Sequence, residues 1–272
     1  MNIFDGKKHA QRVYDVISQT LLGSKLVILQ VGDDLPSSKY IELKQSAAKT
    51  LQVAFELYRY PTNISESILL AKINELNEDP SVTGFMVQSP LPKELNLKSL
   101  VSYILPEKDV DGMNVSLSSV VYPAVVESIL EAIQEAYEVS NSKQNFLKGK
   151  VVSIVNDSII LGRPLAMKLL DLGATVKVLN RFTVNLEDQI RESEIIVSGT
   201  GVRNLIKIAS LSLDQVCIDC GAPQGDFEFN NKFDFDALAN QNFCKFITPV
   251  PKGIGPLTVA KLFENLAKLY SK

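Results

Sequence analysis

Tyr40 and Lys44 are the first residues of this sequence whose types and spacing could support chemistry. They lie four residues apart in SSKYIELKQSAA, a segment predicted to be helical, so both side chains project from one helix face. A lysine whose pKa is lowered towards neutrality by burial can transfer a proton, and a tyrosine can assist it. Amphipathic helices also produce this spacing by chance, so an ordinary helix face is the alternative.

Three further polar residues occupy positions where ligands are often bound. Gln88 ends a predicted strand in VTGFMVQSPLP, and ligands of parallel sheets lie outside the carboxyl ends of strands. An amide that ties down the proline turn is the alternative. Asp109 and Asp111 in KDVDG can form a turn, or can accept hydrogen bonds from amino groups of a ligand.

Two glycine-containing loops in the second half are candidates for ligand contact. Gly199 and Gly201 follow a predicted strand in SGTGVRN, but the third glycine of the dinucleotide fingerprint is missing, so this signal is weak. The loop TPVPKGIGPLT is rich in proline and glycine, which limits its conformational entropy and allows the backbone to approach a ligand closely.

Strands and helices alternate along the whole chain, which predicts an α/β fold with parallel sheets. The first half has strands in KLVILQVG, QVAFELYRYP and VTGFMVQSPLP, with helices at 10–22, 37–51 and 65–77. After a connecting helix at about 125–139, the second half has strands in KVVSIVND, ATVKVLN, EIIVSGTG, QVCIDCG and KFITPVP. This second series is Rossmann-like. The last helix, from Leu257 to Tyr270, is expected to return to the first domain.

Composition excludes several classes of protein. The 272 residues are 46% hydrophobic and 22% charged, which is enough to bury substantial cores, and the net charge of −3 argues against a nucleic-acid partner. The sequence has no apolar run near the ~18 residues of a membrane span, and its start has no secretory signal pattern. We therefore expect a cytoplasmic protein without a membrane partner.

Histidine and cysteine chemistry is not expected. His9 is the only histidine and is predicted to be a solvent-facing helix residue, which disfavours histidine-dependent triads and metal sites. Cys217 and Cys220 lie three apart in a predicted strand, so they face opposite sides and are interpreted as buried thiols. No metal site is predicted.

Taken together, the ordered segments resemble the bifunctional methylenetetrahydrofolate dehydrogenase/methenyltetrahydrofolate cyclohydrolase family. The matching segments are VGDDLPSSKYIELKQSAA, VQSPLP, PEKDVDG, SIILGRP, GATVKVLNRFT and ITPVPKGIGPLTVAKL. The resemblance implies a three-layer α/β catalytic domain (1–118 and 256–272), a connecting helix (119–140) and a Rossmann-like nucleotide domain (141–250), in a homodimer. It also implies a folate substrate and NADP as the cofactor.

The resemblance assigns roles to individual residues. Lys44 matches the catalytic lysine, Tyr40 its companion, Gln88 the glutamine that holds the lysine, and Asp111 the carboxylate that binds the pterin ring. The remaining implied substrate-binding residues are Asp109, Pro251, Gly253 and Gly255. The implied cofactor-binding residues are Asn156, Asp157, Ser158, Arg181, Thr200, Gly201 and Ile254.

Departures from the family pattern cluster around the nucleotide. Asn156-Asp157-Ser158 stands where the family has glycine-arginine-serine, and an aspartate there would repel a phosphate of NADP. Arg181 could bind the 2′-phosphate or pair with Asp157. Other departures are PAVVES (123–128), Leu117, Ser119, Ser89 and Lys252.

These changes predict weakened NADP affinity and leave three alternatives open: the bifunctional enzyme, an NAD-linked or cyclohydrolase-only relative, and a non-catalytic folate- or nucleotide-binding protein.

Overall fold

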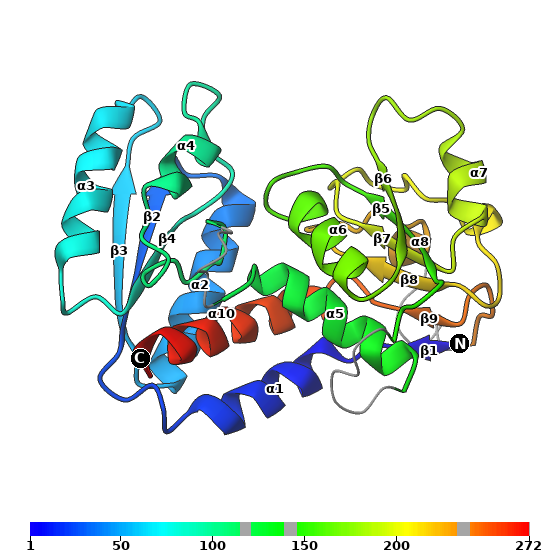
Figure 1. The fold of residues 1–272 in the computed structure, drawn as a ribbon, viewed down its shortest axis with the longest axis horizontal. Coiled ribbons are helices and arrows are strands. Elements are labelled where there is room, and N and C mark those ends of the chain that lie inside the picture. Colours follow the sequence, from blue (N-terminus) through cyan, green and yellow to red (C-terminus); the bar gives the residue numbers. More distant parts are fainter. Residues whose placement is uncertain (115–120, 139–145, 233–239, 272) are drawn as a thin grey trace. The chain divides into compact units, whose positions relative to one another are not determined.

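A computed structural model of the chain describes residues 1–114, 121–138, 146–232 and 240–271 (Figure 1). The chain divides into two compact units, each built from separate stretches of sequence. Unit 1 contains residues 1–9 and 125–258, and unit 2 contains residues 10–124 and 259–272. The predicted return of the C-terminal helix to the first half is confirmed, because its residues from Val259 onward belong to unit 2.

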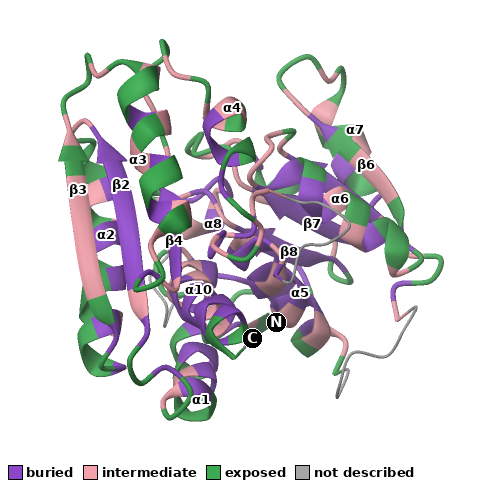
Figure 2. Ribbon diagram, turned by 60° about the vertical axis from the view of Figure 1, so that its left-hand side comes forward, coloured by how far each residue is buried: buried purple, intermediate pink, exposed green. Residues whose placement is uncertain are grey.

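Unit 2 is built on a small parallel sheet. Its elements in chain order are most of α1 (Gly6–Ile17), then β2 (Lys25–Val31), α2 (Leu35–Thr50), β3 (Ala54–Tyr60), α3 (Glu66–Glu78), β4 (Gly84–Val87) and α4 (Leu97–Ser102). The strand order is β3-β2-β4, with every pair parallel. Figure 2 shows the middle strand β2 buried along nearly its whole length, whereas the edge strand β3 is largely half-buried.

Helices cover both faces of this sheet, so the predicted three-layer arrangement is confirmed. Alternate residues of a strand face opposite sides. Val27, Leu29 and Val31 form one core with apolar residues of α3 and α4. On the opposite face, α2 and the C-terminal helix α10 (Ile254–Tyr270) lie against β4.

Unit 1 is a Rossmann-like domain with one larger parallel sheet. Its elements are β1 (Asn2–Ile3), α5 (Ala124–Ala136), β5 (Val151–Val155), α6 (Gly162–Asp171), β6 (Thr175–Leu179), α7 (Leu186–Arg191), β7 (Ile195–Ser198), a 3₁₀ turn (Ile208–Ser210), β8 (Val216–Asp219), α8 (Phe229–Lys232) and β9 (Phe246–Ile247). The strand order is β1-β9-β8-β7-β5-β6. Strand β5 pairs on one side with β6 and on the other with β7, so the strand order reverses beside β5. Doubly wound sheets bind ligands at such a switch point.

The N-terminal strand β1 was not predicted from the sequence. It pairs in parallel with β9, so residues 1–9 contribute to unit 1 rather than to the sheet that follows them. Gly6 at the start of α1 lies against the backbone of Gly253, and a side chain at Gly6 would come within 1.7 Å of the Gly253 carbonyl oxygen. A glycine is therefore required at this close approach.

Helix boundaries differ from the predictions where capping groups act. α2 begins two residues early, because Asp34 accepts a hydrogen bond from the Ser37 N–H at 2.9 Å and Pro36 suits the first turn. α1 begins at Gly6 instead of about Ala10, since the Asp5 carboxylate accepts from the backbone N–H of Lys8.

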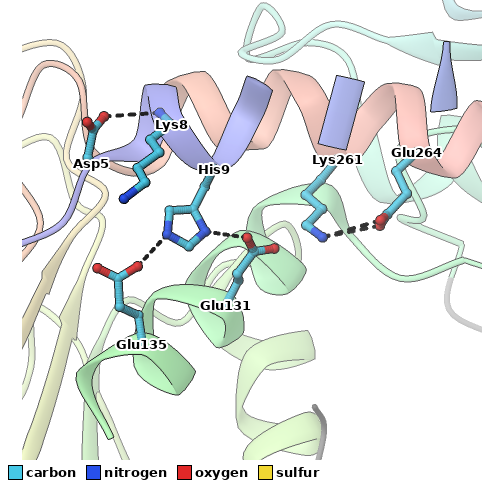
Figure 3. A network of polar contacts seen from close by, with 7 residues as sticks. All are labelled: Asp5, Lys8, His9, Glu131, Glu135, Lys261 and Glu264. Atoms are coloured by element: carbon cyan, nitrogen blue, oxygen red, sulfur yellow. Dashed lines mark hydrogen bonds and ion pairs between the residues drawn. The ribbon is translucent and has the colours of Figure 1, made fainter. Parts of the chain in front are cut away.

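His9 is not the solvent-facing residue that was predicted. The residue is buried, and both ring nitrogens contact carboxylates of α5, those of Glu131 and Glu135 (Figure 3). The error arises because the local stretch is polar, whereas the partners lie more than a hundred positions away in sequence. Within the described residues, no helix is both long enough and apolar enough to cross a membrane.

Candidate functional site

Lys44 lies on the buried face of α2 and points at the sheet. Its ammonium nitrogen donates to the Gln88 side-chain oxygen at 2.8 Å and lies 3.3 Å from the Met86 sulfur. Met86 and Gln88 are two positions apart, at the carboxyl end of β4, so they face the same helix. The lysine side chain is only 7% exposed. The sequence-predicted pair Lys44 and Gln88 is thus brought together.

Burial determines the protonation of this cluster. Desolvation lowers the pKa of Lys44 below its ordinary value, and the negative charge of Asp111 acts in the opposite direction. Desolvation likewise raises the pKa of Asp111, and Lys44 opposes that shift. The lysine is therefore biased towards the neutral amine, which is the form that can accept a proton.

The Gln88 amide has two functions at once. Its oxygen accepts from Lys44, and its nitrogen donates to the Ser89 carbonyl oxygen at 2.8 Å. The Ser37 hydroxyl of α2 donates to the same carbonyl oxygen at 2.9 Å. Gln88 therefore ties the turn before Pro90, and it also contacts the lysine without adding a charge.

The two aspartates of KDVDG have different surroundings. Asp109 is 3% exposed and accepts from the backbone N–H groups of Gly112 (3.0 Å) and Asn114 (2.6 Å), so it forms the turn. Burial raises the pKa of Asp109 to about 6. Asp111 is half-buried and is the carboxylate that acts on Lys44, while Tyr40 is half-buried one turn earlier on α2.

Sequence reasoning missed two polar or polarisable neighbours of this cluster. One is Met86, and the other is Gln30, which lies at the end of β2 and whose amide contacts Ser38 of α2 and Arg59. On each strand, the neighbours of these two residues point into the core on the other face of the sheet. The period of two could therefore have placed them on the face that carries Gln88.

In unit 1, a hollow of about 590 Å³ opens at the carboxyl ends of β5, β6 and β7. Its lining residues are Val155, Asn156, Asp157, Leu179, Asn180, Arg181, Phe182, Thr183, Leu186, Thr200, Val202 and Leu205. This is the switch point of the sheet, where a nucleotide is expected. Four of the predicted cofactor residues line it, namely Asn156, Asp157, Arg181 and Thr200.

The turn after β5 is held by the side chain of Asn156. Its oxygen accepts from the N–H groups of Ser158 (2.8 Å) and Gly162 (3.1 Å), and its nitrogen donates to the Gly199 carbonyl oxygen at 2.7 Å. The Ser158 hydroxyl also donates to Asn156. Hydrogen bonds among these side chains and the backbone therefore fix the turn at the edge of the hollow. Where the family has a flexible glycine, Asn156 holds this turn with its side chain.

Arg181 and Asp157 do not pair with each other. Asp157 accepts from the Asn180 side-chain nitrogen at 3.2 Å, whereas the Arg181 guanidinium lies over the Phe182 ring at 4.8 Å. Among the described residues, Arg181 makes no ion pair. The alternative that Arg181 neutralises Asp157 is therefore wrong, and the arginine can meet an anion. Asn180 and Phe182 were missed by the sequence reasoning.

The remaining predicted residues lie in loops of unit 1 or at the start of α10. Gly201 follows Thr200 with a φ of 74°, and Pro251 and Gly253 follow β9. Ile254, which is 3% exposed, and Gly255 open α10.

Among the departures from the family pattern, Lys252 has a φ of 85°, so its backbone keeps the conformation suited to the glycine it replaces. The segment PAVVES runs into α5, Ser89 accepts from Gln88, and Leu117 and Ser119 lie outside the described residues.

Comparison with known families assigns a domain to each half of the chain. Residues 4–111 match the catalytic domain of the tetrahydrofolate dehydrogenase/cyclohydrolase family, and residues 131–272 match its NAD(P)-binding domain. The chain belongs to this family. The bifunctional protein FolD of a Hydrogenobaculum strain is 32% identical over 100% of this chain and 99% of its own length.

Solved structures support the same assignment. The bifunctional FolD dehydrogenase/cyclohydrolase of Campylobacter jejuni is 30% identical, with a TM-score of 0.86 over 100% of this chain and 99% of its own. The dehydrogenase-cyclohydrolase of Trypanosoma brucei, solved with NADP cofactor and an inhibitor, is 25% identical, with a TM-score of 0.84 over 99% and 97% of the two chains. The family's two-domain fold therefore extends over the whole chain.

Proposed function

We propose that this protein oxidises 5,10-methylenetetrahydrofolate to the methenyl form with a nicotinamide nucleotide, and then hydrolyses the methenyl cation to 10-formyltetrahydrofolate. The observation that carries the proposal is the buried Lys44 amine, held 2.8 Å from the Gln88 oxygen and within the field of Asp111. Family membership and the bifunctional relatives give the same reaction class. The folate chemistry belongs to unit 2, and nucleotide binding belongs to unit 1.

The hydrolytic step needs a base beside a cationic carbon. A neutral Lys44 accepts a proton from the water that attacks the methenyl carbon. The ring then opens because the bond from this carbon to N5 breaks: the new hydroxyl loses its proton, N5 gains one, and the formyl group stays on N10. The positive charge of the substrate further favours the neutral amine. Gln88 holds the amine in place, Tyr40 accompanies it, and Asp111 accepts hydrogen bonds from the amino and ring N–H groups of the pterin.

The hollow of unit 1 suits the adenosine end of the nucleotide. When bound, the nucleotide supplies the hydride acceptor, so the protein contributes binding and orientation. Arg181 follows β6, at the position where Rossmann folds bind the ribose 2′ group. Its guanidinium does not pair with Asp157. We therefore propose NADP as the preferred cofactor and retain an NAD-linked enzyme as the second candidate, because the Asp157 carboxylate lines the same hollow.

The deciding experiment follows both reactions in purified protein. Methylenetetrahydrofolate is supplied with NADP and separately with NAD, while reduced nicotinamide and the methenyl intermediate are recorded together. Turnover with either nucleotide supports the dehydrogenase and ranks the cofactors. Hydrolysis of added methenyltetrahydrofolate without redox turnover identifies a cyclohydrolase-only relative, and inactivity in both assays supports a binding protein instead.

A matched pair of variants tests the role of Lys44. We expect Lys44→Ala to abolish hydrolysis while the fold is kept, whereas Lys49→Ala, an exposed lysine of the same helix, should leave hydrolysis unchanged. Full hydrolysis by Lys44→Ala would exclude the lysine as the base.

The assembly and compartment are also proposals. We propose a homodimer, which light scattering of the purified protein would test. The three cysteines are all free thiols, which suits a reducing compartment, so we propose the cytoplasm.

A further inference from the structure

Asp226 lies beneath the loop that closes one side of the nucleotide hollow. Its side chain is fully buried, and one carboxylate oxygen accepts three hydrogen bonds: from the Ser198 hydroxyl (2.5 Å), the Thr200 N–H (2.6 Å) and the Thr200 hydroxyl (2.9 Å). Thr200 itself is exposed and lines the hollow. The buried carboxylate of Asp226 thus fixes Thr200, an exposed residue in the lining of the hollow, by hydrogen bonds from the protein side.

The same bonds extend along the loop. The Thr200 hydroxyl accepts from the N–H of Val202 at 3.1 Å while it donates to Asp226. Val202 and Leu205 also line the hollow, and the Leu205 N–H donates to the Val202 carbonyl oxygen. Asp226 is therefore the first acceptor in a series of hydrogen bonds that fixes residues 200–205, which we call the lip of the hollow.

Asp226 is itself held rigidly by the end of β8. The Asp219 carboxylate accepts from the N–H groups of Asp226 (2.9 Å) and Phe227 (3.0 Å), and the Asp226 carbonyl oxygen accepts from the N–H of Ile206. The second oxygen of the Asp226 carboxylate has no hydrogen-bond partner among the described residues. It packs against Gly221, where an added Cβ would lie 2.0 Å away.

The buried carboxylates of Asp219 and Asp226 are a costly arrangement for a core: burial raises the pKa of Asp219 to about 6, and the negative charge of Asp226 adds to the rise. Each loses its hydration, and their like charges repel. Neutral residues could pack this space at lower cost, so the arrangement is best explained by what the charge does for the loop. Hydrogen bonds to an ionised acceptor are stronger than neutral ones, so a carboxylate fixes Thr200 more firmly than an amide or hydroxyl would.

We propose that Asp226 is a positioning residue for the nucleotide: through Thr200 it holds the lip 200–205 in the shape that receives the cofactor. This inference rests on the proposed use of a nicotinamide nucleotide. Asp226 does not touch the hollow itself, because Thr200 lies between them. Gly221 is its necessary neighbour, since any larger residue would displace the carboxylate.

The test combines direct nucleotide binding with amide hydrogen exchange. Titration of NADPH fluorescence gives a dissociation constant, and exchange of the Thr200 and Val202 amides reports on the lip without any nucleotide. In Asp226→Ala we expect faster exchange at both amides and nucleotide affinity weakened about tenfold or more, as expected for lost bonds to a charged acceptor. Asp226→Asn keeps the shape and should recover part of both effects.

Two further variants guard against a general loss of folding. Gly221→Ala removes no hydrogen-bonding group, but its new Cβ displaces the Asp226 carboxylate. This variant should therefore reproduce the effects of Asp226→Ala. Ser198→Ala removes a donor to the same oxygen from the strand instead of the lip, and should leave nucleotide affinity unchanged. Hydrolysis of methenyltetrahydrofolate, assigned to unit 2, serves as the control for intact protein.

The outcomes separate this inference from the proposed function. Unchanged exchange and affinity in Asp226→Ala would overturn it, as would equal losses in Asp226→Ala and Ser198→Ala. A wild-type protein that bound no nucleotide would refute the proposed dehydrogenase and with it the role in binding. Exchange at Thr200 and Val202 would still decide whether Asp226 holds the lip.

Discussion

Replacing His9 with glutamine should remove a pH-dependent part of the stability of unit 1. In the folded protein, Nδ1 of the ring lies 2.5 Å from the Glu131 carboxylate and Nε2 contacts Glu135 (Figure 3). The ring also packs against Phe4, with centroids 4.7 Å apart. Glu131 and Glu135 are one helical turn apart on α5. Without an imidazolium between them, their charges repel.

The magnitude follows from the contacts. A hydrogen bond to a charged group contributes about 1.5–3 kcal/mol when it is buried. The histidine side chain is 9% exposed, but those of Glu131 and Glu135 are 25% and 40% exposed, so solvent screening reduces each bond. We therefore expect His9→Gln to lower the free energy of unfolding by about 2 kcal/mol at pH 6.

The pH dependence has a definite sign. The hydrogen bond that the ring donates to Glu131 is the largest cause that raises the pKa of His9 above 6.5, burial opposes it, and the charges of Glu135 and Glu131 add to the rise. The charged residues of the segment around His9 are Asp5, Lys7, Lys8 and Arg12, of which Asp5 and Lys8 are drawn in Figure 3. A raised pKa means that the stabilisation is complete below pH 6.5. The stabilisation is lost as the pH rises through the pKa of His9 in the folded protein.

Urea unfolding followed by circular dichroism at pH 6 and pH 9 measures the effect. The difference between wild type and His9→Gln should be large at pH 6 and small at pH 9. Lys7→Gln, an exposed change on the same helix, is the control and should cost little at either pH. An equal loss at the two pH values would show that packing, and not the charged imidazolium, accounts for the stabilisation.

Four other predictions can be checked directly. The rate of methenyltetrahydrofolate hydrolysis should rise with pH around an inflection below 10.5, because burial lowers the pKa of Lys44, and an inflection at or above that value would argue against the assignment. Arg181→Ala should raise the KM for NADP about tenfold or more while changing that for NAD little; equal changes would exclude a 2′-phosphate contact. Gly253→Ala should lower the melting temperature strongly, since the new Cβ would lie 2.4 Å from the Pro249 carbonyl oxygen. Lys252→Gly should raise the free energy of unfolding in urea by roughly 1 kcal/mol, because it relieves a positive φ.

The regular part of the fold could be predicted because its signals are local. Apolar runs such as KLVILQVG became β2, and the alternation of strands and helices correctly gave two parallel sheets. The two-residue strand β1 could not be predicted, because so short a segment has no periodicity of its own. It is a strand only because β9 supplies its hydrogen bonds.

The candidate site was predictable to the same extent. Lys44 and Gln88 could each be singled out by a recognisable position, on a helix face and at a strand end, and the family resemblance predicted that the two would pair. The surroundings of His9 and Asp226 were not predictable, since their partners lie far away in sequence or are backbone groups of a loop. A single sequence does not reveal which distant polar groups folding will bring into contact.

The pairing of β1 with β9 also determines when the protein can fold during its synthesis. Chains are made from the N-terminus, and domains generally fold in that order as they leave the ribosome. Here the first strand must wait for Phe246 and Ile247, and unit 2 must wait for its share of α10. Unit 1 therefore cannot be completed before β9 has been made, and unit 2 cannot be completed before the part of α10 from Val259 onward has been made. Until these segments have been made, a nascent chain exposes apolar surface of both units, which makes it a client for chaperones that shield such surface.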